Sequence, residues 1–225
     1  MPRIDLESLR SKGRTTLSES EAKTLLRENG IPTTEFLLPK REELSSLEIG
    51  FPMVVKVDSP KVLHKTEVGG VYTDIRDWEE LVRRYDEIRE RFPGAQVLVE
   101  PMEFGNAEFI VGVLKDPVFG MSIMFGMGGI LTELYQDVTF RKIPIAPEDA
   151  EEMLDEVRGG EILRGFGGIR ADKESMRRLL SMTSKMADHL RDQIHQIDLN
   201  PVIVKENGCV VVDAKVILEK ELKEK

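Results

Sequence analysis

The chain has 225 residues, of which 40% are hydrophobic and 32% are charged, and its formal net charge is −9. This composition supports a folded core and excludes wholesale disorder. An acidic chain repels nucleic acid and anionic lipid, so neither a nucleic acid nor a membrane is expected as a partner. The single cysteine, Cys209, excludes an internal disulfide and a multi-cysteine zinc site, and it is expected to fill a strand as a small apolar residue.

The first ten residues are charged and contain no apolar stretch typical of a signal peptide. No apolar run approaches the ~20 residues that a membrane-spanning helix needs. A cytoplasmic location is therefore expected.

The chain begins with a polar stretch, residues 1–17, which is expected to form a loose arm. The stretch "LSESEAKTLLRENGIP" then predicts a helix. Ser18 and Glu21 fit a capping box at its start, and Gly30 fits its end.

The remaining elements are predicted from periodicity and turn residues. Strands are expected at 53–57, 71–75, 95–102, 107–114 and 121–125, helices at 76–92, 146–157 and 171–193, and a hairpin around Asn207-Gly208 at the end. Together they predict an α/β (α+β) chain with an N-terminal arm (1–17), a first subdomain (18–100) and a second subdomain (101–225).

The terminal hairpin predicts a cation site. If Asn207-Gly208 is a two-residue turn, Asn200 faces Lys215 and becomes a diagonal neighbour of Asp213, with α-carbons roughly 7 Å apart. Two hard oxygen ligands at this separation suit Mg²⁺. The alternative is an exposed polar stripe on an edge hairpin.

Three charged residues stand where strands begin, end or are interrupted. Lys56 in "MVVKV" is either the outward residue of a half-buried strand or a point charge for a phosphate. Glu100 ends a strand immediately before Pro101, where free backbone groups can hydrogen-bond an adenine edge. Glu108 can bind a ribose hydroxyl or a phosphate-bound metal, although exposed glutamates are ordinary.

Two glycine-rich stretches, "HKTEVGGV" and "GMGGILTE", place backbone amides where they can approach an anion. Neither matches the P-loop or the dinucleotide-binding fingerprint, and plain hairpin corners are the alternative. The first stretch begins with His64, an expected exposed imidazole that can accept a phosphoryl group. The alternative is an ordinary surface histidine, which is also the expectation for His189 and His195.

Five stretches in this order resemble one known family, and together they cover nearly everything from Leu17 to Leu218. They are "LSESEAKTLLRENGIP", "FPMVVKVDSPKVLHKTEVGGV", "VLVEPM", "EFIVGVLKDPVFGMSIMFGMGGILTELYQDVTFRKIPI" and "IDLNPVIV…VVVDAK". The chain resembles the ATP-grasp part of ADP-forming acyl-CoA synthetases. The resemblance is strongest to the archaeal members in which this part is a separate β subunit. Residues 165–173 lack the arginine-and-proline pattern expected near this position, which leaves their role open.

The resemblance implies an ATP-grasp fold, in which two α/β subdomains hold a nucleotide between them. It also implies a role for each candidate residue. Lys56 would contact ATP phosphates, and the adenine hinge would consist of Glu100, Pro101 and Met102. Glu108 would lie at the nucleotide, and the transferred phosphate would be approached by Gly126, Gly128 and Gly129. The Mg²⁺ ligands would be Asn200 and Asp213. His64 would carry phosphate between subunits on a swinging loop, with Gly69 and Gly70 as hinges.

The implied reaction is acyl-CoA + ADP + phosphate ⇌ acid + CoA + ATP. No second domain for CoA or for acyl-phosphate formation is recognised, so an α subunit is expected to supply those steps, in an α2β2 heterotetramer. This chain would perform the nucleotide half, phosphohistidine + Mg·ADP ⇌ histidine + Mg·ATP. The alternatives are a stand-alone ATP-grasp carboxylate–amine ligase and a non-catalytic nucleotide-sensing module.

Overall fold

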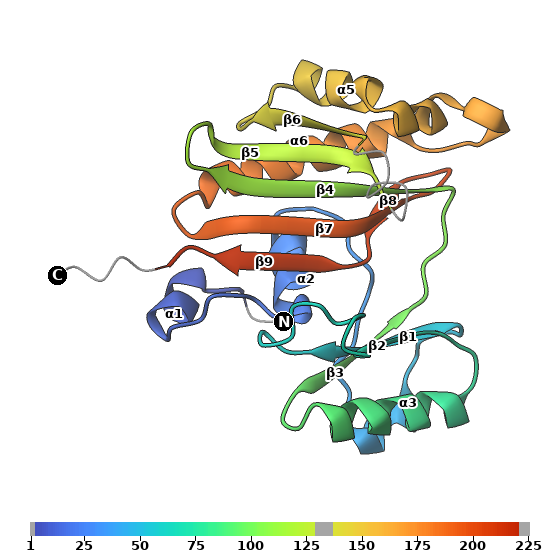
Figure 1. The fold of residues 1–225 in the computed structure, drawn as a ribbon. Helices are drawn as coiled ribbons and strands as arrows, with labels where there is room; N and C mark the ends of the chain where they lie inside the picture. Colours follow the sequence, from blue (N-terminus) through green and yellow to red (C-terminus); the bar gives the residue numbers. More distant parts are fainter. Residues whose placement is uncertain (1–2, 129–136, 221–225) are drawn as a thin grey trace. The chain divides into compact units, whose positions relative to one another are not determined.

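The computed structural model describes residues 3–128 and 137–220, and these form two compact units (Figure 1). Unit 1 takes the described residues of Met1–Leu17, Glu21–Thr33 and Phe104–Lys225. Unit 2 takes Ser18–Ser20 and Thr34–Glu103. The chain therefore contributes to unit 2 twice, first with three residues and then with one long segment.

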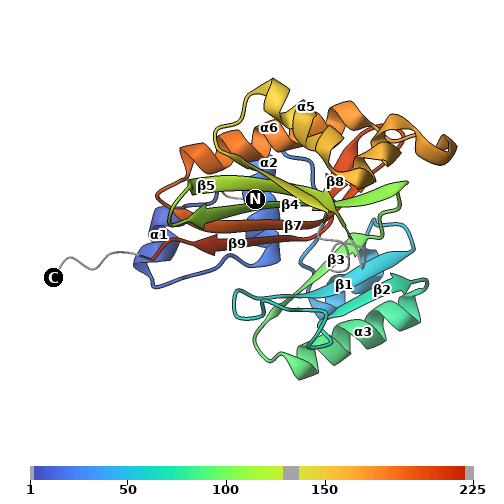
Figure 2. The ribbon, with the colours of Figure 1, turned by 45° about the horizontal axis from the view of Figure 1, so that its top comes forward.

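Unit 2 is built on a three-stranded antiparallel sheet with the strand order β2–β1–β3. Its elements are β1 (Met53–Asp58), β2 (Val71–Ile75), β3 (Gln96–Pro101), α3 (Trp78–Arg91) and the 3-10 helix η1 (Arg41–Ser46). Alternate residues of β1 are buried with the apolar face of α3, namely Met53, Val55 and Val57 with Leu81, Tyr85 and Ile88. Figures 1 and 2 both show α3 along one side of this sheet. The strands and the helix predicted for residues 53–102 are confirmed.

Helix α3 starts at a side-chain cap, because the Asp77 carboxylate accepts a hydrogen bond from the Glu80 amide (2.8 Å). Trp78, the first residue of α3, is 41% exposed. It sits in the first turn and packs edge-on against Phe51, with 5.0 Å between ring centroids.

The second face of β1 is buried as well, and it is polar. Lys56 and Asp58 point to this face, where they are 3% and 4% exposed, beside Val54. The interpretation of Lys56 as the outward residue of a half-buried strand is therefore wrong. A strand buried on both faces must pair its charged groups, because an unpaired buried charge is strongly unfavourable.

Unit 1 is built on a six-stranded antiparallel sheet with the order β6–β5–β4–β7–β8, and β9 also pairs with β7. Its strands are β4 (Ala107–Asp116), β5 (Gly120–Met127), β6 (Val138–Lys142), β7 (Ile194–Val204), β8 (Cys209–Val211) and β9 (Ala214–Leu218). Its helices are α1 (Leu6–Ser11), most of α2 (Glu19–Glu28), α5 (Pro147–Glu156), α6 (Lys173–His189) and the 3-10 helices η2 (Arg158–Arg164) and η3 (Phe166–Gly168). The long elements predicted for this part of the chain are confirmed.

One face of the unit 1 sheet carries the main hydrophobic core. Phe109 and Phe125 stack on neighbouring strands, with 5.1 Å between ring centroids. Leu26 of α2 and Leu180 of α6 are buried in the same core, and Figure 1 shows both helices on one side of the sheet.

The N-terminal segment is folded, so the prediction of a loose arm was wrong. Leu6 and Leu17 are 4% exposed and belong to the core of unit 1. The Leu17 amide donates to the Val216 carbonyl (3.0 Å), and the Leu218 amide donates to the Thr15 carbonyl (2.8 Å). Isolated leucines in a polar stretch show no periodicity, so this strand-like pairing was invisible in the sequence.

The terminal hairpin forms, but its predicted register was wrong by two residues. Val204 pairs with Cys209, so the turn contains residues 205–208 instead of two residues. The Asp172 carboxylate accepts the Gly208 amide (2.8 Å), and the Asp172 amide donates to the Lys205 carbonyl (2.9 Å). Because Asp172 also caps α6, a long-range contact from residues 165–173 sets this turn.

Cys209 is buried in β8, as predicted, and burial raises the pKa of its thiol. Within residues 3–128 and 137–220, none of the helices has the length and apolar character needed to cross a bilayer.

Candidate functional site

The lysine in β1 is at the centre of a buried ion cluster in unit 2. The Lys56 ammonium lies 2.8 Å from Glu19 Oε1 and 2.7 Å from Glu100 Oε1. Its side chain is 4% exposed, and those of the two glutamates are 1% and 0% exposed. Lys56 is therefore a compensated buried cation, held between the start of α2 and the end of β3.

Each of the two glutamates contacts one further residue through its second carboxylate oxygen. The Lys65 ammonium contacts Glu19 Oε2, and the Thr34 hydroxyl donates to Glu100 Oε2 (2.6 Å). We call this set the buried ion cluster: Lys56, Glu19, Glu100, Lys65 and Thr34. Two ammonium and two carboxylate groups balance in charge within it.

The strand register explains how the sheet supplies two of these members. Val54 pairs with Glu100 across β1 and β3, so Lys56, two residues along, shares a face with Glu100. The remaining members, Glu19, Thr34 and Lys65, were missed from the sequence. One signal was present, because a lysine inside an apolar strand requires carboxylate partners.

The predicted adenine hinge runs from Glu100 to Met102 at the end of β3. The Glu100 side chain is committed to Lys56 and Thr34. The Met102 amide donates to the Pro52 carbonyl (2.9 Å), so the expectation of a free amide there was wrong. Pro101 has no amide hydrogen, so a purine edge at this stretch would meet carbonyl groups first.

His64 lies in the turn between β1 and β2, and its side chain is 63% exposed, as predicted. Its Nδ1 lies 3.4 Å from Glu67 Oε1. The Val68 amide donates to the His64 carbonyl (3.3 Å), which closes one turn of the loop. The ring is therefore presented to solvent on a short, internally hydrogen-bonded segment.

The glycines after His64 have packing roles in this arrangement. Gly69 has φ +66, a left-handed conformation that side chains disfavour. A Cβ on Gly70 would lie 2.6 Å from Val57 Cγ1, and the Gly70 amide donates to the Lys65 carbonyl (2.7 Å). Gly70 is thus fixed against β1, and its predicted use as a hinge stays a prediction.

In unit 1, Asn200 and Asp213 lie opposite each other. The Asn200 amide donates to the Asp213 carbonyl (3.1 Å), and the adjoining pair is Leu199 with Ala214. The corrected register makes them direct neighbours instead of diagonal ones. The predicted proximity of the pair therefore survives an error in the predicted turn.

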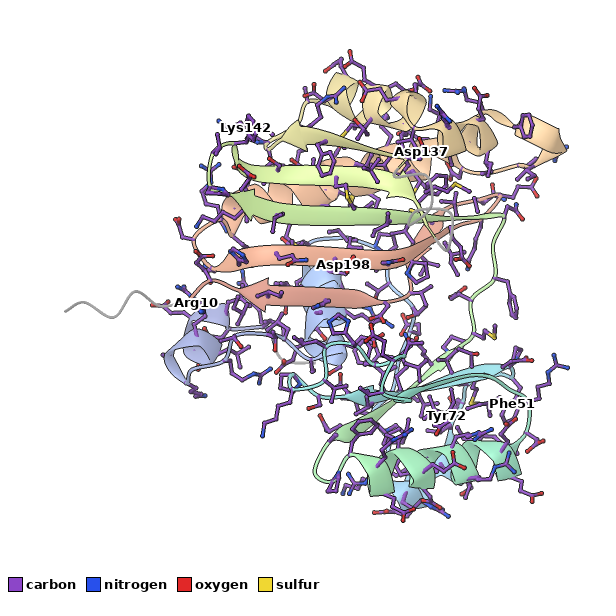
Figure 3. The ribbon with its side chains drawn as sticks, viewed as in Figure 1. Arg10, Phe51, Tyr72, Asp137, Lys142 and Asp198 are labelled. Carbon is purple, nitrogen blue, oxygen red and sulfur yellow. The ribbon has the colours of Figure 1, made fainter. Side chains whose placement is uncertain are left out.

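Asp198 is the neighbouring acidic group on β7 (Figure 3). Burial raises its pKa, the Asp213 charge raises it further, and Lys215, its partner on β9, opposes both effects. Among the residues that the structure describes, no group of three or more His, Cys, Asp or Glu side chains is placed to hold a metal ion. The side-chain amide oxygen of Asn200 and the carboxylate of Asp213 are hard oxygen donors of the kind that Mg²⁺ prefers.

A groove of about 650 Å³ occupies the open face of the unit 1 sheet. Asp198 and Lys142, labelled in Figure 3 on β7 and β6, both line it. Ile110, Met124 and Phe140 give it an apolar floor. The groove is thus largely apolar, and one of its lining residues is Asp198, which lies near Asn200 and Asp213.

Glu108 is exposed near the start of β4. Exposure agrees both with a role in nucleotide binding and with an ordinary surface glutamate. The Gly128 amide donates to the Glu108 carbonyl (2.8 Å). A Cβ on Gly126 would lie 2.6 Å from Val138 Cγ1, so this glycine permits close strand packing. Gly129 and the rest of its loop to residue 136 lie outside the described residues.

Comparisons with known proteins agree with this architecture. A family model for the ATP-grasp domain matches residues 8–218. The subunit beta of ADP-forming acetate–CoA ligase II from Pyrococcus furiosus is 43% identical over 95% of this chain and 96% of its own. ADP-forming acetate–CoA ligase II from Archaeoglobus fulgidus is 36% identical over 90% of this chain, which matches only 30% of that longer protein.

Solved structures extend the similarity to three dimensions. A chain of acetyl-coenzyme A synthetase 1 from Ca. Korarchaeum cryptofilum, in complex with coenzyme A and Ca-AMPCP, is 40% identical with a TM-score of 0.88. The match covers 95% of this chain and 98% of that chain. A second structure of that enzyme, with coenzyme A and Mg-AMPPCP, matches with a TM-score of 0.84, and there the phosphohistidine segment points towards the nucleotide binding site.

Proposed function

The chain belongs to the ATP-grasp family, among the β subunits of ADP-forming acetate–CoA ligases, and from this premise we propose that it transfers phosphate between a phosphohistidine and Mg·ADP. The overall reaction is acyl-CoA + ADP + phosphate ⇌ acid + CoA + ATP. The observation that carries the proposal is the match to a β subunit over almost the full length of both chains. The match to the ATP-grasp family model and the match to a solved structure confirm the predicted ATP-grasp fold.

The transfer step exchanges one bond to phosphorus for another. A terminal oxygen of ADP attacks the phosphorus, and the bond between phosphorus and the His64 ring nitrogen breaks. A proton on the second ring nitrogen lets the histidine leave as neutral imidazole, and ATP forms. An exposed imidazole on a turn suits this role, because phosphate must reach it from outside the chain.

Unit 2 would supply positive charge and the adenine contact. Lys56 would meet the phosphates, and because two carboxylates already share its ammonium, a phosphate there would join or displace one of them. The strand end from Glu100 to Met102 would offer carbonyl groups to the adenine.

Unit 1 would supply the cation ligands and the phosphate loop. Asn200 and Asp213 would hold Mg²⁺, which, when bound, neutralises the charge on the phosphoryl oxygens. Glu108 would bind the ribose or a phosphate-bound cation, while Gly126 and Gly128 shape the backbone beside it.

A partner chain follows from the comparisons. In Pyrococcus furiosus the similar chain is a separate subunit, whereas in Archaeoglobus fulgidus the similar region is less than a third of one polypeptide. We propose that an α subunit provides CoA binding and acyl-phosphate formation, in a cytoplasmic α2β2 assembly.

Labelling with γ-phosphate-labelled Mg·ATP tests the function directly. The full chain should acquire a label that is stable in base, labile in acid and removed by added ADP. Bound ATP without label would instead indicate a nucleotide sensor. ATP turnover that requires an amine would indicate a carboxylate–amine ligase.

Asp213→Ala should weaken binding of Mg·ADP by roughly 10–100-fold, because one of two cation ligands is lost. Calorimetric titration with and without Mg²⁺ measures this, and affinity for metal-free ADP should stay within about twofold. Asp192→Ala, which removes an exposed acidic group from the same unit, is the matched control. Equal Mg·ADP affinity in the two variants would remove Asp213 from the cation site.

A further inference from the structure

The loop that carries His64 is tied at two points to one short stretch of chain, Ser18–Ser20. On the first side, the Asp58 carboxylate accepts the Ser20 amide (2.9 Å), the Ser20 hydroxyl (2.6 Å) and the Ser18 hydroxyl (3.1 Å). Asp58 is the last residue of β1 and is 4% exposed. The loop therefore departs from a fixed point.

On the second side, the residue that follows His64 is fixed as well. The Lys65 ammonium contacts Glu19 Oε2, and the two side chains are 11% and 1% exposed. The other oxygen of Glu19 lies 2.8 Å from the Lys56 ammonium. One carboxylate thus joins the strand lysine to the neighbour of the exposed histidine.

These two anchors leave residues 59–64 as the span between fixed points. His64 and Lys65 are adjacent, and their α-carbons are only ~3.8 Å apart. While Lys65 holds Glu19, the His64 ring can rotate but its backbone cannot travel far. The remainder of the loop is closed behind it, because the Gly70 amide donates to the Lys65 carbonyl (2.7 Å).

We propose that the Glu19–Lys65 ion pair is a latch that holds His64 on the nucleotide side and must open for the histidine to leave. The inference rests on the proposed function, which gives Lys56 to the nucleotide phosphates and phosphate transfer to His64. Lys65 is then a positioning residue, since it acts through the placement of His64. Closing the pair places residues 64 and 65 next to the carboxylate that Lys56 also contacts.

Lys65→Gln isolates the latch, because Lys56 keeps both of its carboxylates in this variant. Lys61→Gln is the matched control, since it removes the same charge from an exposed position in the same loop. Lys65→Arg keeps the charge and tests rescue. Thermal melting of each full-length variant verifies folding.

Two measurements then decide the matter. In Lys65→Gln, the rate of amide hydrogen exchange over residues 59–70 should rise by about tenfold or more, because the loop no longer has an ion pair to break before it opens. The rate of His64 labelling at saturating Mg·ATP should fall by roughly 10–100-fold, with the KM for ATP within about twofold of the original. Lys65→Arg should restore both values, and Lys61→Gln should change neither.

The proposal of a latch is overturned if Lys65→Gln has the same amide exchange rate and the same His64 labelling rate as the original chain. It is also overturned if Lys65→Arg does not restore these two rates. A labelling defect that comes entirely from a raised KM would place Lys65 in nucleotide binding instead. If the original chain takes no label, the proposed function fails, while the exchange comparison still decides whether the pair restrains the loop.

Discussion

His64→Ala should abolish ATP formation by the complex with the α subunit, with a loss on the order of 10³-fold or more. His64 is the one histidine of unit 2, whereas His189 and His195 belong to unit 1. Nucleotide affinity and melting temperature should be preserved, since the His64 side chain is 63% exposed. A coupled assay of ATP release from acyl-CoA, ADP and phosphate measures the loss.

His189→Ala is the control for this experiment, because it removes an exposed imidazole from α6 in unit 1. The α subunit should continue to form acyl phosphate in the presence of the His64→Ala chain. ATP formation at the original rate by His64→Ala would rule out a relay through this residue, whatever the fold.

Lys56→Met should destabilise unit 2 by about 3–5 kcal/mol, the usual cost of removing one partner from a buried ion pair. The substitution takes away the ammonium that Glu19 Oε1 and Glu100 Oε1 share, in a site where all three side chains are at most 4% exposed. Urea unfolding followed by the fluorescence of Trp78, the single tryptophan, reports on this unit.

Arg41→Ala offers a matched comparison for stability. Arg41 pairs with Asp86 in the same unit, but the side chains are 51% and 50% exposed, so its loss should change stability far less. Combining Lys56→Met with Glu100→Gln should recover part of the loss, because the uncompensated carboxylate is removed too. A Lys56→Met chain as stable as Arg41→Ala would show that the cluster is not a structural ion pair.

The sequence predicted the elements whose residues follow a clear period. β1 and β3 were predicted because short valine-rich apolar runs are typical of strands, and α3 was predicted because its helical spacing reports burial of one face. The segment 1–17 was misread because Leu6 and Leu17 are single anchors without a period. The hairpin register depended on Asp172, which lies more than thirty residues before the turn, and no local pattern reports such a contact.

The candidate site shows the same division. Lys56 stood out because it interrupts an apolar strand, and Glu100 because it ends a strand immediately before Pro101. Asn200 and Asp213 stood out because the predicted terminal hairpin brings them close together. Glu19 and Lys65 did not, because a glutamate at a helix start and a lysine in a turn are ordinary surface choices. Only the fold brings them to Lys56, so the ion cluster could not be assembled from spacing alone.

Three residues near the N-terminus, Ser18–Ser20, belong to unit 2 although their neighbours on both sides belong to unit 1. A fragment containing only residues 34–103 would therefore lack the Glu19 carboxylate, which contacts Lys56 and Lys65, and the Ser20 hydroxyl, which donates to Asp58. Recombination cannot exchange this unit as one uninterrupted cassette.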